Sequence, residues 1–302
     1  MKAFLESMTA SAAVVLTKFH GVHVLEVQLN RPQKHNALSV EVFRALRKTF
    51  DDLAASIGTG GGDDQLADVR CVVLTGGDAK SFCAGIDLQD LAQFAANTGD
   101  DAARTSLRIR HSIAEMQDSF TAVANCPVPV IVAIHGMCVG AGVDLICCAD
   151  IRLASREAVF SIKEVDIAIA ADLGTLQRLP AIVGNQSTVA DWCYTARSFD
   201  TVEAAAEGLI SRRVFEGPAE VRSAALAMAQ QIAGKSPVAV HGTKHTLRLN
   251  TSAATQRGLD AMKLMNAALL QSDDIVKVVA GAMKKGQKSQ SKDAKPIVFS
   301  KL

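Results

Sequence analysis

The sequence predicts an α/β core followed by a helical C-terminal region. Up to about Gly184, short runs rich in β-branched residues alternate with longer helical patterns, and beyond that residue helix signals dominate. Strands and helices in alternation are typical of α/β folds. Hydrophobic residues make up 49% of the 302 residues and charged residues 21%, a balance typical of soluble globular proteins that bury a substantial core.

Four segments of the first half predict strands because each is bounded by turn-forming residues. These strands are expected over residues 22–29, 69–75, 128–135 and 150–154. Between them, Ser39 can cap a helix that runs to about residue 56. Residues 102–125 form a long amphipathic helical pattern, and a short helix is expected to begin near Gly140.

Two dipeptides in the second half, Gly217-Pro218 and Ser236-Pro237, each predict a helix start, with a capping residue before a proline at the first helical position. Further helices are expected over residues 255–271 and 273–283. We therefore expect four parts, which are an N-terminal extension (1–20), a core (21–210), a helical region (211–284) and a flexible tail (285–302).

Charge and apolar patterning argue against several classes of function. Lys and Arg total 32 against 31 Asp and Glu, so no overall basic field indicates nucleic acid or an anionic membrane as a partner. The longest apolar runs, such as residues 128–134, are far shorter than the roughly 20 residues of a membrane-spanning helix. Seven cysteines without paired metal-like spacing predict reduced, buried thiols rather than disulfides or a zinc site.

The last three residues, Ser300-Lys301-Leu302, form the tripeptide that the peroxisomal import receptor reads. A Lys-rich polar stretch over residues 284–295 precedes it and would keep it accessible. We therefore expect import into a peroxisome or a related organelle such as a glycosome. The alternative is a solvated tail without a targeting role.

Two glycine-bearing segments follow predicted strands and suit a backbone that approaches a ligand closely. They are SFCAGIDL (81–88) and HGMCVGAGVDL (135–145). Small residues leave their backbone N–H groups uncovered, and the second segment opens a helix whose N-terminal dipole favours a negative charge. Two loops that each offer one N–H to the same oxygen form an oxyanion hole. Alternatively, the glycines only serve tight strand-to-helix turns.

Four acidic residues are candidates for proton transfer. Asp144 falls in the first turn of the helix predicted near Gly140, where the dipole favours its charge without any catalytic role. Glu164, Asp166 and Asp172 lie in a weakly polar segment, SIKEVDIAIAADLGTLQRLP (161–180), where desolvation would raise a carboxyl pKa and suit it to proton transfer. A strand period would place Glu164 and Asp166 on the same face, so either could face solvent.

Four segments, in the same order and over nearly the whole chain, resemble the crotonase, or enoyl-CoA hydratase/isomerase, superfamily. They are LNRPQKHNALS (29–39), FCAGIDL, HGMCVGAGVDL and KEVDIAIAADLGTLQRLP (163–180). The resemblance implies a spiral of repeated ββα units and a helical C-terminal region that forms trimers, which can pair into hexamers. Within the family, Asp144 and the AAD of residues 170–172 are similar to the delta-3,5-delta-2,4-dienoyl-CoA isomerases, since hydratases carry Glu and a Gly-rich segment there.

The same resemblance implies a reaction and a role for each candidate residue. The N–H groups of Ile86 and Ala141 would hold the thioester oxygen of a 3,5-dienoyl-CoA. Asp172 would remove a proton from C2 and Glu164 would deliver one to C6, which gives the 2,4-dienoyl-CoA, while Asp144 would tune the pair. Two carboxyl groups suffice for this chemistry, so no metal or redox cofactor is expected, and coenzyme A enters as part of the substrate.

Several expectations remain open at this stage. The resemblance places Ala84, Asp87 and Lys34 along the channel for coenzyme A, although an exposed Lys34 could simply be solvated. His135, at the end of a predicted strand without an adjacent nucleophile, is expected to be structural. The rival functions are an enoyl-CoA hydratase that uses Asp144 with Glu164, and a non-catalytic member of the fold that binds RNA.

Overall fold

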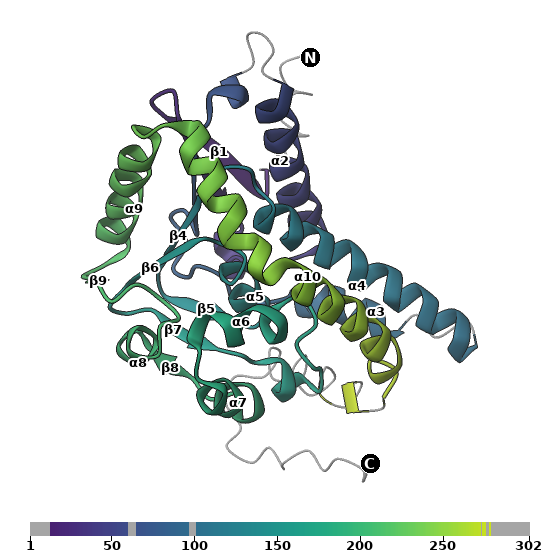
Figure 1. Ribbon diagram of the computed structural model, residues 1–302. Helices are drawn as coiled ribbons and strands as arrows, with labels where there is room; N and C mark the ends of the chain where they lie inside the picture. The colour runs from purple at the N-terminus through teal and green to yellow at the C-terminus, as the bar shows by residue number, and fades with distance from the viewer. Residues whose placement is uncertain (1–12, 60–64, 97–100, 273, 276–277, 279–302) are drawn as a thin grey trace, which may run out of the picture.

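The computed structural model describes residues 13–59, 65–96, 101–272, 274, 275 and 278 of the chain (Figure 1). A six-stranded sheet has the order β1-β2-β3-β4-β6-β9. The antiparallel pair β1 (Val15–His20) and β2 (Val24–Leu29) begins it, and β3 (Cys71–Thr75), β4 (Val130–Ile134), β6 (Ile151–Ser155) and β9 (Val214–Phe215) follow in parallel. All four predicted strands are confirmed.

The sequence did not predict β1, and its place changes the expected N-terminal boundary. His20 pairs with Val24 across the turn, and the ladder continues to Val15 opposite Leu29. The boundary expected at residue 20 therefore falls inside a hairpin, and residues 15–20 belong to the sheet. Polar residues interrupt this edge strand, which is half exposed, and so it lacks the continuous apolar run that identifies the central strands.

A second, smaller sheet completes the repeated ββα pattern. It contains β5 (Met137–Val139), β7 (Val159–Ser161) and β8 (Phe199–Asp200) in the order β5-β7-β8. After β4, the chain continues through β5 into α5 (Ala141–Ile146), and after β6 it continues through β7 into η3 (Glu164–Ile167) and α6 (Thr175–Val183). Each of these two turns of the chain thus adds one strand to each sheet before a helix, as the resemblance implied.

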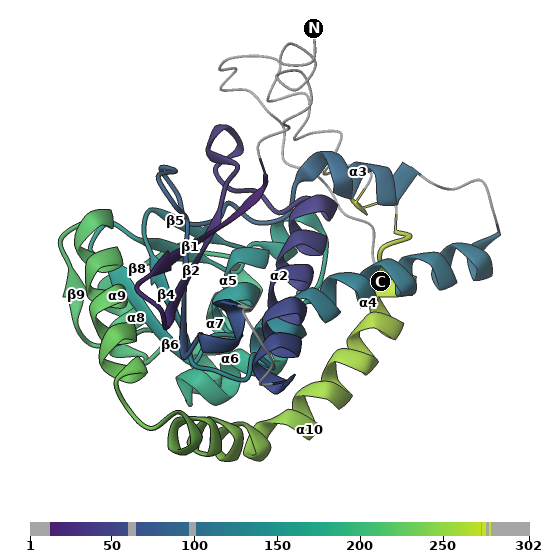
Figure 2. The ribbon, with the colours of Figure 1, turned by 90° about the horizontal axis from the view of Figure 1, so that it is seen from above.

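Helices cover both faces of the large sheet, as Figure 2 shows. One face packs on α2 (Val40–Thr59) and α4 (Ala102–Ala124), which lie against each other, and α3 (Leu88–Ala96) precedes α4. The other face is covered by α9 (Pro218–Ala233), whose small residues Ala225, Ala229 and Ala233 pack on Val73 and Ile131. This second face confirms that the central strands are buried on both sides, which explains their unbroken apolar runs.

The C-terminal region is more continuous than the sequence predicts. The remaining short elements are η1 (Pro32–Lys34), η2 (Gln65–Asp68), α7 (Gln186–Thr195) and α8 (Thr201–Ala206). Helix starts at Pro218 and Pro237 are confirmed, but the helix expected over residues 255–271 is the second half of one 33-residue helix, α10 (Pro237–Leu269). Packing against α4 and α6 holds this helix together through its polar middle. Most of residues 273–283 lie outside the described part.

None of the described helices combines the length and the apolar character that a membrane crossing needs. The seven cysteines are all buried with free thiols. Burial of this kind agrees with the reduced thiols that the sequence predicts, and desolvation raises the pKa of Cys83, for example, to about 12. These thiols are packing groups.

Candidate active site

Two loops that follow β3 and β4 run side by side. Cys83 N–H donates to Met137 O (2.9 Å) and Val139 N–H donates to Cys83 O (3.0 Å), which forms a short parallel bridge. Gly85 adopts φ +95°, and a Cβ at this residue would lie 3.1 Å from Val139 O and 3.9 Å from Ala141 N. Glycine at this position therefore permits both the backbone conformation and the close approach of the two loops.

The two amides predicted to form an oxyanion hole lie where these loops meet. Ala141 is the first residue of α5, so its N–H points out of the helix N-terminus without an intrahelical acceptor. Ile86 follows Gly85, and no hydrogen bond from the Ile86 or Ala141 N–H is found within the described part of the chain. Ala141 needs no left-handed conformation, as we expected of an alanine there. The arrangement suits two donors to one oxygen.

Glu164 reaches this junction from a short 3₁₀ helix. The strand interpretation of its segment is wrong, because η3 covers Glu164–Ile167 and Ala168 closes the turn with φ 59°. The Glu164 carboxyl lies beside Gly140, because a Cβ added at Gly140 would be 3.2 Å from Glu164 Oε1. The other carboxyl oxygen, Oε2, is buried and has no hydrogen-bond partner among the described residues. Asp166 points to solvent and pairs with Lys163 (2.6 Å), so it does not share the Glu164 environment.

Asp172 lies in the extended segment before α6 and is held by neighbours from two helices. Its Oδ2 accepts a hydrogen bond from Asn266 Nδ2 of α10 (2.7 Å). Its backbone carbonyl accepts one from Gln117 Nε2 of α4 (2.7 Å), and the same Gln117 amide donates to Leu259 O of α10 (3.2 Å). The sequence analysis missed both amides, because nothing near Asp172 in the sequence indicates them.

Asp144 connects α5 to the start of α6. Its carboxyl is buried, and Oδ1 accepts a hydrogen bond from the backbone N–H of Thr175, the first residue of α6 (2.6 Å). A carboxylate at a helix N-terminus is stabilised by the unpaired N–H groups and the dipole there. Asp144 therefore has a structural partner of its own while it lies close enough to influence the other two carboxyls.

Burial is the main cause that raises the pKa values of the three carboxyl groups, and the negative charge of Asp144 raises those of Glu164 and Asp172 further. Desolvation, followed by the charges of Asp144 and then Asp172, raises the pKa of Glu164 well above its usual value. Burial raises the pKa of Asp172 to about 7, against the lowering effect of the Asn266 hydrogen bond. Burial raises the pKa of Asp144 to about 6, against the Thr175 bond. Burial and the neighbouring negative charges therefore favour the protonated form of Glu164.

A small apolar cavity lies between Ile86 of the first loop and Asp172. Its volume is about 40 Å³, and it is enclosed by residues of α3, α4, the segment before α6 and the chain just after α10. Apart from Ser112 and Asp172, its walls are apolar, and they include Ile86, Leu91, Ile109, Ile113, Met116, Ile169, Leu173, Leu270 and Ile275. An apolar group placed here would lie between an amide donor and a carboxyl group.

The residues expected along the channel for coenzyme A have mixed environments. Lys34 is exposed at the end of η1. Asp87 is buried and pairs with Arg31 (2.9 Å), so its carboxylate has an internal partner. Ala84 donates its N–H to His35 O (3.0 Å) and so has no amide free for a ligand. Of these three residues, Lys34 is the one with an exposed charged side chain.

The segment around residue 36 contains a further residue that the sequence analysis missed. Asn36 is buried with φ 56°, and its Nδ2 lies within hydrogen-bond distance of the carbonyls of Gly76, Ser81 and Phe82. The Asn36 side chain therefore holds the loop after β3 in place. An Asn within a turn such as KHNA is a signal of the left-handed conformation that could have identified it. The structural role predicted for His135 is confirmed, since its buried ring bonds to Ala79 O (2.8 Å).

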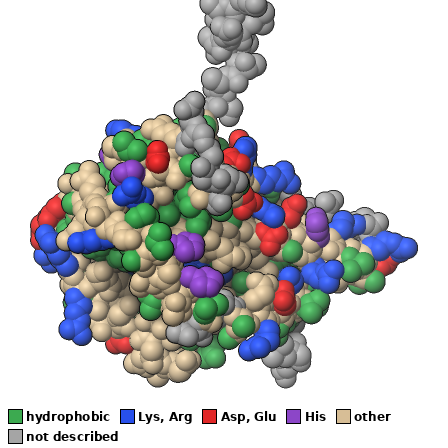
Figure 3. Space-filling view, turned by 45° about the horizontal axis from the view of Figure 1, so that its top comes forward, with side chains coloured by type: hydrophobic (Ala, Val, Ile, Leu, Met, Phe, Trp, Pro, Cys, Tyr) green, Lys and Arg blue, Asp and Glu red, His purple; other side chains and the backbone are tan. Residues whose placement is uncertain are grey.

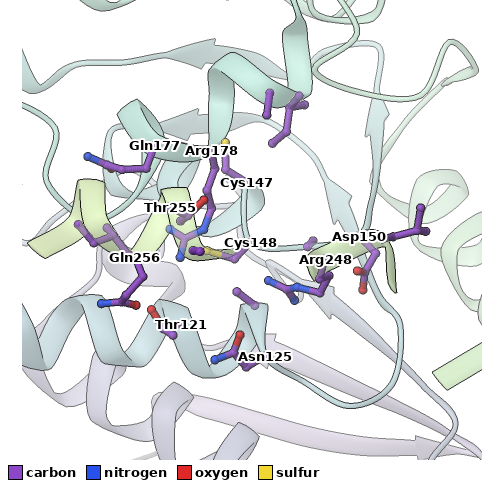
Figure 4. A pocket seen from close by; sticks show the side chains of 17 residues that line it. Thr121, Asn125, Cys147, Cys148, Asp150, Gln177, Arg178, Arg248, Thr255 and Gln256 are labelled. Carbon is purple, nitrogen blue, oxygen red and sulfur yellow. The ribbon is translucent and has the colours of Figure 1, made fainter. Parts of the chain in front are cut away.

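A larger cavity of about 550 Å³ lies between α4, α6 and α10, and the candidate carboxyls do not line it. Figure 4 shows Arg178 of α6 and Arg248 of α10 extending toward this cavity, with Thr121 and Asn125 on the α4 side. It is open and rich in polar groups, unlike the apolar cavity beside Asp172. Size therefore does not identify the candidate active site, whereas the meeting of buried carboxyls and unpaired amides does.

A family model for enoyl-CoA hydratase/isomerase matches residues 20–290, which include both loops, the three carboxyls and α10. The chain belongs to the enoyl-CoA hydratase/isomerase family. Within this family, the mitochondrial delta(3,5)-delta(2,4)-dienoyl-CoA isomerase of Mus musculus is 44% identical over 281 residues, which are 93% of this chain and 80% of that one. The peroxisomal delta(3,5)-delta(2,4)-dienoyl-CoA isomerase of Arabidopsis thaliana is 43% identical over 264 residues, 87% and 90% of the two chains.

Solved structures of the enoyl-CoA hydratase/isomerase family show the same fold. An enoyl-CoA hydratase/isomerase from Mycobacterium paratuberculosis superposes with a TM-score of 0.76 at 22% sequence identity, over 89% of this chain and 98% of that one. The crotonase-type fold expected from the four motifs is therefore confirmed.

Proposed function

We propose that this protein isomerises 3,5-dienoyl-CoA to 2,4-dienoyl-CoA in the oxidation of unsaturated fatty acids. The observation that carries the proposal is Asp172, a carboxyl group that lines an apolar cavity with Ile86, whose charge acts on Glu164, and which is absent from the hydratase pattern. Two relatives above 40% identity bear the name of this isomerase, one from an animal and one from a plant.

In the proposed mechanism, the N–H groups of Ile86 and Ala141 hold the thioester oxygen. Asp172 takes a proton from C2, and the electrons form a dienolate whose oxygen charge the two amides stabilise; one such donor is worth about 3 kcal/mol in other enzymes. Glu164 then gives its proton to C6, and the double bonds finish at C2 and C4. One proton is removed and one is delivered, so the substrate keeps its composition.

The electrostatic environment supports this division of roles. A general base works best when its pKa lies near the operating pH, and burial raises that of Asp172 to about 7. A general acid must hold a proton at that pH, and burial together with the charges of Asp144 and Asp172 supports this role for Glu164 because they raise its pKa well above the usual value. After one turnover the two proton states are exchanged, so solvent must restore them before the next.

The chemistry calls only for proton transfer, so we propose that the enzyme uses no metal or redox cofactor and that coenzyme A is part of the substrate. The apolar cavity beside Asp172 supports binding of the acyl chain, and exposed Lys34 supports contact with a phosphate of coenzyme A. Ala84 and Asp87 would then shape the channel through packing, because their polar groups have internal partners.

We further propose import into a peroxisome or glycosome, by recognition of Ser300-Lys301-Leu302, and assembly into trimers or hexamers. The C-terminal tripeptide lies outside the described residues, and the relatives carry both mitochondrial and peroxisomal names. Large apolar side chains that α10 exposes support an assembly surface on this helix, and they are Val238, Leu247, Leu249, Leu264, Met265 and Leu269. A fluorescent fusion with and without the tripeptide, and the native mass of the protein, test these two statements.

The rival functions receive less support. A hydratase would use Asp144 together with Glu164, but Asp144 is buried and engaged by the Thr175 amide. An RNA-binding role would call for a basic stripe, whereas on the face that Figure 3 shows Lys and Arg side chains are interspersed with Asp and Glu.

The experiment that decides the function mixes purified protein with 3,5-dienoyl-CoA and follows the ultraviolet absorbance of the conjugated 2,4-dienoyl thioester. We expect absorbance to rise with enzyme concentration, and a parallel assay with 2-enoyl-CoA to show little hydration. Rapid hydration without isomerisation would replace the proposal with the hydratase.

A further inference from the structure

The side-chain amide of Asn266 is the group on α10 that touches the candidate active site. Asn266 is fully buried, and its Nδ2 donates to Asp172 Oδ2 (2.7 Å) and to Ala170 O (2.9 Å). A carboxylate and a backbone carbonyl only accept hydrogen bonds, so these two contacts define which end of the amide faces Asp172. A donor from a distant helix therefore clamps both the carboxylate and the backbone of the segment that carries it.

Burial above all, and then the charge of Asp144, oppose ionisation of Asp172, while its own backbone N–H favours the carboxylate. Asp144 of α5 raises its pKa, and the Asp172 charge in turn raises that of Glu164 in η3. The α4 side presents the uncharged side chains Ser112, Ile113 and Met116 at the shared cavity. The side-chain hydrogen bond that stabilises the carboxylate form comes from Asn266.

We infer that Asn266 is a positioning residue for the isomerisation, which holds the Asp172 carboxylate in the orientation and the ionised form that proton removal from C2 requires. The inference rests on the proposed function for the identity of the reaction. It makes α10 part of the catalytic apparatus, although this helix lies outside the strands and loops that carry the four family motifs.

Gln117 offers a matched control because it tethers the same segment through the backbone alone. Its Nε2 donates to Asp172 O and to Leu259 O of α10, so it links the same two elements without touching the carboxylate. Loss of either amide removes buried hydrogen bonds and lowers stability. Only loss of Asn266 should change the protonation of Asp172.

The test compares Asn266→Leu with Gln117→Leu in the full-length enzyme, using kcat/KM for 3,5-dienoyl-CoA between pH 5.5 and 9.5. A hydrogen bond to a charged group stabilises it enough to shift its titration by roughly one pH unit. We expect the acid limb of Asn266→Leu to move up by about one unit, which lowers activity about tenfold at pH 6 and much less at pH 9. Gln117→Leu should melt earlier but keep the wild-type limb.

A second variant and a second measurement keep the inference testable if Asn266→Leu does not fold. Asn266→Ala removes the same donor with a smaller side chain, so its acid limb should also move up. Infrared titration of the Asp172 carboxyl, assigned by its loss in Asp172→Asn, reads the same shift without substrate. An unchanged limb and titration in both Asn266 variants would overturn the inference, whereas wild-type protein without isomerase activity would overturn the proposed function instead.

Discussion

Glu164 and Asp172 lie only eight positions apart in the segment 161–180, yet the fold gives their carboxyl groups different surroundings. Glu164 sits on a tight 3₁₀ turn beside Gly140, with one buried oxygen that lacks a described hydrogen-bond partner. Asp172 sits on an extended stretch and accepts a hydrogen bond from α10. The difference teaches that a side-chain donor from a distant helix favours the ionised form of Asp172, whereas burial and neighbouring charges favour the protonated form of Glu164.

The largest expected effect on activity comes from removing the proposed base, Asp172. Asp172→Asn keeps the shape but cannot accept the C2 proton, so we expect kcat for isomerisation to fall about 10³-fold. Asp166→Asn is the matched control, because this carboxylate of the same segment is exposed and pairs only with Lys163. Activity close to wild type in Asp172→Asn, measured by product absorbance, would refute the assignment.

Removing the proposed acid, Glu164, should separate proton removal at C2 from proton delivery at C6. Glu164→Gln cannot deliver a proton to C6, and we expect product formation to fall about 10²-fold. Asp172 should still remove and return the C2 proton, so in deuterated water the substrate should gain deuterium at C2, as mass spectrometry would detect. If C2 exchange stops together with product formation, Glu164 and Asp172 do not have separate roles.

A substitution at Gly85 can disturb the contact between the two loops that carry the Ile86 and Ala141 amides. Gly85→Ala forces a side chain into φ +95° and toward Val139 O, which we expect to cost about 1–3 kcal/mol of stability. It should also misplace the Ile86 amide and lower kcat/KM about 10²-fold. The control is Gly21→Ala, where φ is +70° but nothing lies within 4 Å. A similar stability loss with full activity is expected there, and equal activity losses would argue against an oxyanion hole.

The smallest effect concerns pH and stability. Folding raises the pKa of Asp172 from 3.8 to about 7, so the folded protein binds more protons than the unfolded chain between these values. The free energy of unfolding should therefore fall as pH rises through this interval. Asp172→Asn removes this loss, and we expect it to be more stable than wild type at pH 8 and similar at pH 4. Urea denaturation at the two pH values measures it, and equal stability at pH 8 would contradict the burial cost.

The sequence alone indicates much of this site because its parts are local. The strand, the glycines and the first helical residue that place Ala141 are contiguous, so their pattern predicts the loop directly. Glu164 was misplaced on a strand because the turn depends on Ala168 adopting a left-handed conformation, which alanine rarely does. The partner of Asp172 could not be predicted, since Asn266 meets it only after α10 packs on α4 and α6.

The hydrogen bond from α10 also limits how far the chain could be shortened. A fragment that ends near residue 210 would retain β1 to β8, both loops and Glu164. It would lose Asn266, the apolar residues that close the cavity after α10, and the cover that α9 provides for the sheet. The spiral of strands holds most of the reacting groups, but it is not by itself a minimal enzyme.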